Sequence, residues 1–288
     1  MENRVSALFG PGGNGDWFKR EGNKSTLQAP DWVRAVGLDA YEFEAGQGLR
    51  TPPETLQAIG DKAREAGIHM SFHTPYFISL SGVEEQTRLK SIDYLSQSVQ
   101  AAKLLGAGTI VIHTGSAAKI SREEAMALCL DTLEKAMEQI PFDGVLWGLE
   151  TMGKVNQLGT VDEVISLCKR DARLVPVVDF GHVNARERGG QFETAEDYRR
   201  VFDRIGTALG DETARNMHCH FSKIEWTAAG EKRHLTFADE VYGPAFEPLA
   251  EAMVREKLTP VIICESAGTQ AEDALFMKTQ YQSLYKKG

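Results

Sequence analysis

The chain has 288 residues, of which 42% are hydrophobic and 25% are charged, and its formal net charge is -9 at pH 7. This is the composition of an ordinary globular protein. The acidic balance argues against attraction of the whole surface to nucleic acid or membranes, although a local basic surface could still bind phosphates. The apolar run at the amino terminus is too short for a signal peptide, and no segment has the roughly 20 apolar residues that cross a bilayer. We therefore expect a cytoplasmic monomer with no membrane partner.

Eight short apolar runs are predicted to be strands. The first two, at residues 4–10 and 39–46, each end in or next to glycine. The other six each end in a potential metal ligand, in chain order His73, His113, Glu150, Asp179, His220 and Glu265. These six residues are 29 to 45 positions apart, which is about the length of one strand, one helix and two loops in an α/β barrel.

Helical periodicity fills the intervals between the runs. The expected helices cover residues 52–67, 88–108, 121–140, 160–171, 194–209 and 246–257. Gly106 is a predicted helix stop, and Ser121 with Glu124 forms a predicted capping box. The repeated alternation of strand and helix, without a linker, predicts an α/β fold of the (β/α)8 TIM-barrel type, as a single domain over residues 1–288. Residues 222–248 make an unusually long connection, which we expect to be a functional loop.

The six strand-end residues predict a metal site. In a parallel barrel the carboxyl ends of all strands meet at one mouth, where barrel enzymes have their active sites. Imidazole nitrogens and carboxylate oxygens are the ligands of zinc and related ions. Glu150 and Glu265 end apolar strands, so a bare carboxylate there would be costly without a cation. The alternative for each glutamate is an ion pair with a nearby Arg or Lys.

Three further histidines are candidate ligands. His182 follows Asp179 by three residues and should face the same mouth. His218 and His220 share one face of a strand because side chains alternate with period two. We favour His220 because it lies nearer the carboxyl end, and His218 stays an alternative. His234 lies in the long connection, where a histidine is ordinarily exposed to solvent.

At this point the residues resemble a known family, endonuclease IV, the zinc-dependent apurinic/apyrimidinic endonucleases of the xylose-isomerase-like barrels. The motifs are FHTPYFISL (72–80), VIHTGS (111–116), LETMGK (149–154), VDFGH (178–182), HFSKIE (220–225), GEKRH (230–234) and IICES (262–266). The resemblance implies two to three Zn²⁺ ions, with Mn²⁺ or another divalent ion as alternatives. It also implies which residues hold each ion. The first ion would be held by His73, His113 and Glu150, and the second by Glu150, Asp179, His220 and Glu265. The third would be held by His182 and His234.

The third set departs from the family pattern. The family has an aspartate two residues before the second histidine, whereas Lys232 stands there in this chain and Glu231 lies three residues before His234. Glu231 is therefore the candidate replacement ligand, with a shifted loop geometry.

The resemblance also implies a substrate and a reaction. The substrate would be duplex DNA with abasic sites, cut at the phosphodiester on the 5′ side of the lesion during base excision repair. Glu150 would bridge two ions and Glu265 would orient the attacking water, so both are candidate catalytic residues. Tyr76 matches an aromatic residue that enters DNA at the lesion, and Lys232 with Arg233 would contact its phosphates.

A divalent-metal-dependent sugar isomerase or epimerase of the same superfamily is the rival interpretation. Glu150, Asp179, His220 and Glu265 alone resemble the single-metal site of such enzymes, in which two glutamates move a proton beside a carbonyl. The extra imidazoles of His73, His113, His182 and His234 exceed the needs of one ion and favour the endonuclease.

Overall fold

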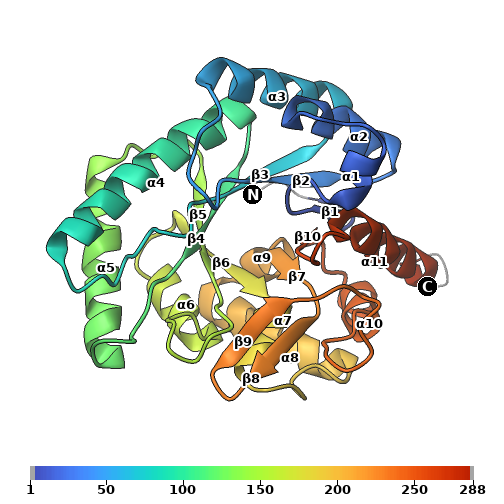
Figure 1. Cartoon of the computed structure of the whole chain (residues 1–288). Helices are drawn as coiled ribbons and strands as arrows, with labels where there is room; N and C mark the ends of the chain where they lie inside the picture. Colours follow the sequence, from blue (N-terminus) through green and yellow to red (C-terminus); the bar gives the residue numbers. More distant parts are fainter. Residues whose placement is uncertain (1–3, 286–288) are drawn as a thin grey trace.

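Eight parallel strands surround a central axis, with helices packed outside them (Figure 1). The structure is a computed structural model that describes residues 4–285. The strand order is β1-β10-β7-β6-β5-β4-β3-β2. The strands are β1 (Leu8–Pro11), β2 (Ala40–Glu44), β3 (His69–His73), β4 (Thr109–His113), β5 (Leu146–Glu150), β6 (Leu174–Asp179), β7 (His218–Phe221) and β10 (Val261–Cys264). The predicted TIM barrel is confirmed.

The sheet closes where its first and last strands meet. Gly12 forms a parallel bridge with Glu42, and the Asp39 N–H donates to the carbonyl of Phe9 at 2.9 Å. A Cβ atom on Gly10 would lie 1.8 Å from the Ala40 carbonyl oxygen. Only glycine allows the two strands to approach so closely.

Helices cover the outside of the barrel and bury its apolar outer face. They are α1 (Asp16–Arg20), α2 (Ala29–Ala35), α3 (Pro53–Ala66), α4 (Glu85–Leu105), α5 (Arg122–Gln139), α6 (Val161–Cys168), α7 (Phe180–Arg186), α8 (Ala195–Leu209), α9 (Asp211–Arg215), α10 (Glu247–Arg255) and α11 (Gln270–Tyr285), with a short 3₁₀ turn at Thr26–Gln28. Each of the six predicted helices is present. Among residues 4–285, no helix is long and apolar enough to cross a membrane.

The predicted local signals set these helix ends. Gly106 ends α4 in the left-handed conformation, with φ 68°. The Ser121 hydroxyl accepts from the Glu124 N–H, and the Glu124 carboxylate accepts from the Ser121 N–H, so the capping box at the start of α5 is confirmed. Both devices satisfy backbone groups that a helix end would otherwise leave unpaired.

The long connection at 222–248 differs from the prediction, because part of it is a hairpin rather than a loop. Strands β8 (Ile224–Thr227) and β9 (Gly230–His234) pair antiparallel, with a register shift between Glu225 and Trp226. The hairpin docks on the loop after β5, where the Glu231 N–H donates to the Gly153 carbonyl at 2.9 Å. This docking holds one side of the barrel mouth.

Candidate metal centre

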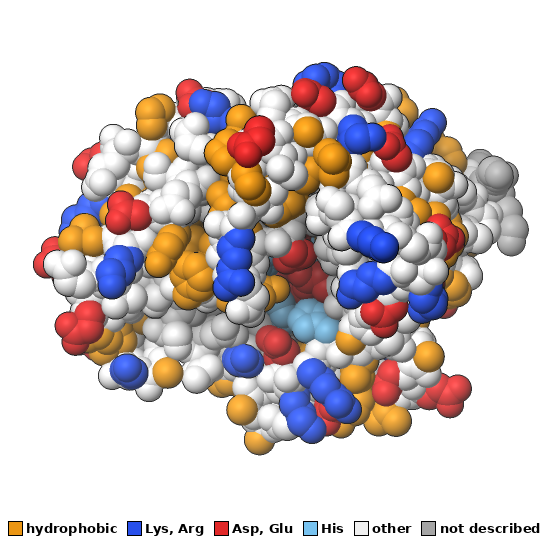
Figure 2. All heavy atoms as spheres, turned by 45° about the horizontal axis from the view of Figure 1, so that its top comes forward, with side chains coloured by type: hydrophobic (Ala, Val, Ile, Leu, Met, Phe, Trp, Pro, Cys, Tyr) orange, Lys and Arg blue, Asp and Glu red, His pale blue; other side chains and the backbone are white. Residues whose placement is uncertain are grey.

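The structure brings the six predicted strand-end residues to one mouth. The strand register aligns them, since His113 lies opposite Glu150 and Asp179 lies opposite His220. Glu265 comes directly after β10 rather than within it. Figure 2 shows the hollow, with imidazole and carboxylate side chains at its floor and Lys and Arg side chains on its rim. A cavity of about 450 Å³ here is lined by His73, Tyr76, His113, Glu150, Met152, Lys154, Gln157, His182, Glu231, His234 and Glu265.

Glu150 lies at the centre of the cluster and is fully buried. Its Oε2 is 3.1 Å from His113 Nε2 and 3.6 Å from His73 Nε2. Its Oε1 is 3.1 Å from His220 Nδ1 and 3.3 Å from His182 Nδ1. One carboxylate therefore faces four imidazole rings, two at each oxygen, so each oxygen could serve a different cation.

The first candidate set consists of His73, His113 and Glu150, whose ligand atoms lie within 4.8 Å of one another. His73 Nδ1 is 2.9 Å from the carbonyl oxygen of Thr74. A carbonyl can only accept, so Nδ1 always carries a proton, and Nε2, which faces Glu150, is the nitrogen that can give up its proton to bind a metal. The backbone thereby selects the nitrogen that is available to a metal.

The second candidate set consists of Glu150, Asp179, His220 and Glu265. Asp179 caps α7, since its Oδ1 accepts from the His182 N–H at 2.7 Å. Its buried Oδ2 accepts no hydrogen bond from the described residues and has only an ion-pair contact, with His182 Nδ1 at 3.3 Å. The sequence alternative of an Arg or Lys partner does not occur, because every ion pair of Glu150, Asp179 and Glu265 within residues 4–285 is with a histidine. Buried carboxylates without such partners fit a metal.

The third candidate set contains His182 and His234, with Glu265 within 4.8 Å of both. Glu231 also reaches it, because its Oε2 lies 3.5 Å from His182 Nε2 and its Oε1 lies 4.0 Å from His234 Nε2. Gly153 makes room for this carboxylate, since a Cβ there would lie 2.8 Å from Glu231 Oε2. The family's aspartate is replaced by Lys232 in this chain. The register shift in the hairpin, together with a side chain longer than that of aspartate, brings the Glu231 carboxylate to the third candidate set instead.

The pKa values of the cluster are shifted by burial and by the charges of neighbouring carboxylates and imidazoles. Burial, with Glu265 nearby, raises the pKa of Asp179 to about 7. Burial opposes the charged form of His73, but the carboxylates of Glu44 and Glu150 outweigh it and raise the pKa of His73 to about 10. Protons on the imidazoles therefore neutralise the carboxylates when no cation does.

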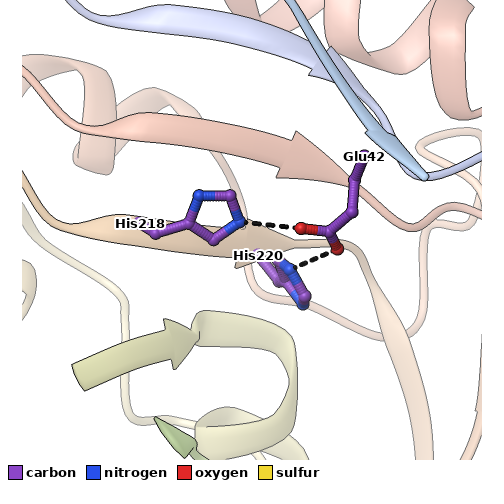
Figure 3. A group of neighbouring side chains, drawn as sticks. All are labelled: Glu42, His218 and His220. Atoms are coloured by element: carbon purple, nitrogen blue, oxygen red, sulfur yellow. Dashed lines mark hydrogen bonds and ion pairs between the residues drawn. The ribbon is translucent and has the colours of Figure 1, made fainter. Parts of the chain in front are cut away.

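Two functional candidates on β2 were missed by the sequence analysis. Glu42 is fully buried and lies 2.9 Å from His220 and 3.0 Å from His218, between the two rings (Figure 3). Glu44 follows two residues later on the same strand face, and no donor among the described residues reaches either of its oxygens. Burial raises the pKa of Glu44 to about 8. The sequence did contain a signal for these residues, because Glu42 and Glu44 stand at alternate positions of an otherwise apolar run and therefore share one face of the strand.

The two histidines of β7 have different neighbours. His220 belongs to the set with Glu150, Asp179 and Glu265, whereas the partner of His218 is Glu42. His218 also lines a larger cavity of about 630 Å³ near the amino ends of the strands. No Asp or Glu is among the described residues that line that cavity, so it has no comparable ligand set.

The predicted DNA-contacting residues lie on the rim. Tyr76 is 53% exposed, and its ring stacks on His113 with centroids 5.4 Å apart. Lys232 and Arg233 are exposed on β9, and each lies 2.6 Å from a Glu225 oxygen. Their charges are therefore partly compensated within the hairpin.

Two other cations near the mouth have structural roles. The Arg186 guanidinium donates to the carbonyls of Met152, Lys154, Val155 and Gln157. Lys223 donates to the carbonyls of Phe237 and Asp239. These contacts hold the surrounding loops in place.

Known proteins resemble the chain over most of its length. The model of the xylose isomerase-like TIM-barrel family matches residues 30–280. An uncharacterised protein of Methanocaldococcus jannaschii is 26% identical over 88% of this chain and 90% of its own. A probable endonuclease 4 of Acholeplasma laidlawii is 29% identical over 74% of this chain and 78% of its own.

Two solved structures have the same fold. Endonuclease IV of Thermus thermophilus matches with a TM-score of 0.68 at 21% identity, over 93% of this chain and 96% of that chain. A D-tagatose 3-epimerase-like protein matches with a TM-score of 0.69 at 17% identity, over 89% of this chain and 93% of that chain. At these identities the two likenesses show the fold alone.

Proposed function

Because the chain belongs to the xylose isomerase-like TIM-barrel family, we propose that it is a zinc-dependent endonuclease that cuts duplex DNA on the 5′ side of an abasic site, in base excision repair. The observation that carries this proposal is the number of donors around Glu150. His73, His113, His182 and His234 extend the four-residue set into three overlapping ligand sets. A one-ion isomerase has no use for them. The endonuclease 4 relative supports the same class.

The residues at the mouth have distinct parts in the proposed reaction. Bound divalent ions would supply a hydroxide near neutral pH and neutralise charge on the phosphate oxygens. Glu150 holds the surrounding imidazoles in place, and Glu265 lies where it can orient the attacking water. The water oxygen bonds to phosphorus as the bond to the 3′ oxygen breaks, and that oxygen takes up a proton to give a 3′ hydroxyl. Tyr76 lies at the rim, where it can stack beside the extruded baseless sugar, which costs less to unstack than a paired nucleotide.

The proposal is tested by incision of a duplex oligonucleotide that carries one tetrahydrofuran abasic analogue, together with the bound-metal content of the same preparation. We expect a single cut 5′ to the lesion and two to three metal ions per chain. A mock preparation from cells without the expression plasmid controls for host nucleases. A folded, metal-loaded protein that makes no cut would contradict the proposal.

A sugar isomerase or epimerase is the second candidate. The observation in its favour is the compact set of Glu150, Asp179, His220 and Glu265, whose ligand atoms lie within 4.8 Å of one another without the other imidazoles. The match to a D-tagatose 3-epimerase-like fold is consistent with it. One metal ion per chain and interconversion of D-tagatose would replace the endonuclease proposal with this one.

Apparent metal affinity should rise with pH. Burial opposes protonation of His182 and His220, but nearby carboxylates outweigh it and raise both pKa values, as they do for His73. A raised pKa means that the metal-free imidazoles are protonated at neutral pH, and a ligand must lose that proton to bind. We expect about a tenfold gain in affinity per pH unit for each proton released, between roughly pH 6 and 9. Competition with a chromophoric chelator, corrected for its own protonation, measures this, and a flat profile would contradict it.

Reversing the charges of Lys232 and Arg233 should weaken binding to abasic duplex and flatten its salt dependence. Each lost phosphate contact lowers the slope of log affinity against log salt by about one. Lys62 and Arg64 on α3 provide the matched control, because each is paired with an aspartate as the hairpin cations are paired with Glu225. Fluorescence anisotropy at several salt concentrations measures both variants. If the hairpin variant has the same salt-dependence slope as wild type, the hairpin is not part of the DNA-binding surface.

A further inference from the structure

Glu42 is a buried charge at the base of the candidate metal centre, outside the ligand sets of the proposed reaction. It lies on β2, whereas its two histidine neighbours lie on β7, on another part of the barrel wall (Figures 1 and 3). Oε2 accepts from the Ser71 hydroxyl at 2.7 Å and from His218 Nε2 at 3.0 Å. Oε1 forms an ion pair with His220 Nε2 at 2.9 Å, and neither of these two atoms has a hydrogen-bond partner among the described residues. Three groups that can donate thus converge on one carboxylate.

His220 presents its two nitrogens to different partners. Nδ1 lies 3.1 Å from Glu150 Oε1 and 3.4 Å from Glu265 Oε1, on the side of the candidate ligands. Nε2 points the other way, to Glu42. A neutral imidazole has one N–H, and only the nitrogen without it can bind a cation. When a cation takes the side of Glu150 and Glu265, Nδ1 has to give up its proton, and the Glu42 carboxylate stabilises the proton that stays on Nε2.

The contacts of Glu42 are explained by hydrogen bonds and an ion pair, without a metal between Glu42, His218 and His220. Oε2 already has two donors, Ser71 and His218, and a carboxylate oxygen has about two lone-pair sites. All four residues are buried, with His218 the most exposed at 7%. The group therefore serves as a rigid support below the ligands, although its atoms also lie close enough together to hold an ion.

We propose that Glu42, fixed by Ser71 and His218, is a positioning residue that sets the tautomer and ring orientation of His220. This rests on the proposed metal centre. Partners of this kind behind a ligating histidine raise its basicity and hold its ring, and their loss commonly weakens metal binding by about 10- to 100-fold. His218, the sequence alternative to His220 as a ligand, thereby has a different role, as a donor to Glu42.

The test uses zinc-loaded full-length protein and the variants Glu42→Gln, Glu42→Asp and His218→Gln. An amide has one acceptor oxygen, so Gln cannot serve the same three donors, whereas Asp keeps the charge. We expect zinc affinity to fall about 10- to 100-fold in Glu42→Gln, with smaller losses in Glu42→Asp and His218→Gln. Glu54→Gln, the same change at the exposed start of α3, should have no effect.

A second measurement separates positioning from general loss of structure. In ¹⁵N-labelled wild type, His220 should show a metal-bound Nδ1 and a protonated Nε2, and this signature should weaken or exchange in Glu42→Gln while persisting in Glu54→Gln. Unchanged affinity and an unchanged signature in Glu42→Gln would overturn the inference. So would the loss of one whole ion from both Glu42→Gln and His218→Gln, which would make the group a metal site itself. A wild-type protein that binds no divalent metal would instead refute the proposed function.

Discussion

Glu150→Gln is expected to lower kcat/KM for incision of abasic duplex by roughly a thousandfold or more. The physical reason is the position of the carboxylate between four imidazole rings, at 3.1 to 3.6 Å from their nitrogens. An amide of the same size has one acceptor oxygen, and its NH₂ group cannot bind a cation. Two of the three ligand sets share Glu150, so the substitution should also lower the metal content.

The assay compares single-turnover incision rates and bound metal for wild type, Glu150→Gln and Glu134→Gln. Glu134 is an ion-paired glutamate on the outer helix α5, about half exposed, so its substitution removes one charge away from the mouth. We expect it to cut like wild type. Near-normal incision by Glu150→Gln would mean that catalysis does not depend on this cluster, and equal loss in both variants would indicate a stability effect.

The ends of the strands were predictable because the candidate ligands themselves mark them. His73, His113, Glu150 and Asp179 are the last residues of their strands, as predicted. A strand buried on both faces is a continuous apolar run, and a polar residue at its end is then a clear boundary. The first strand had no such marker. It was expected at residues 4–10 and lies at Leu8–Pro11.

The placements that local sequence patterns could not give depend on contacts between distant segments. Glu42 is 176 positions from His218, and nothing local to β2 indicates that it would face β7. His218 and His220 both point inward, so periodicity alone could not choose between them. The position of Glu231 depends on the register shift in the β8–β9 hairpin, which was expected to be a loop. Local patterns predict elements, whereas these three placements arise only when separate segments pack together.

Removing the metals with a chelator is expected to abolish incision and to lower the melting temperature by roughly 10 °C. Glu150 and Asp179 are fully buried, and the cluster has no Lys or Arg partner among the described residues to replace a lost cation. A ligand that binds only the folded state stabilises it by about 4 kcal/mol when its concentration is a thousandfold above its Kd. For a chain of this size, that corresponds to a shift of roughly 10 °C.

The chelated protein should regain both activity and stability when Zn²⁺ is added back, with half-recovery of activity at more than one equivalent per chain if several sets must fill. Glu150→Gln serves as the control, since its melting temperature should depend much less on chelator. Differential scanning fluorimetry and the incision assay on the same samples measure the two effects. Full recovery of incision at one equivalent would mean that a single ion is enough for the reaction. An unchanged melting temperature would mean that imidazole protons alone compensate the buried carboxylates, and the metal would then have no structural role in this barrel.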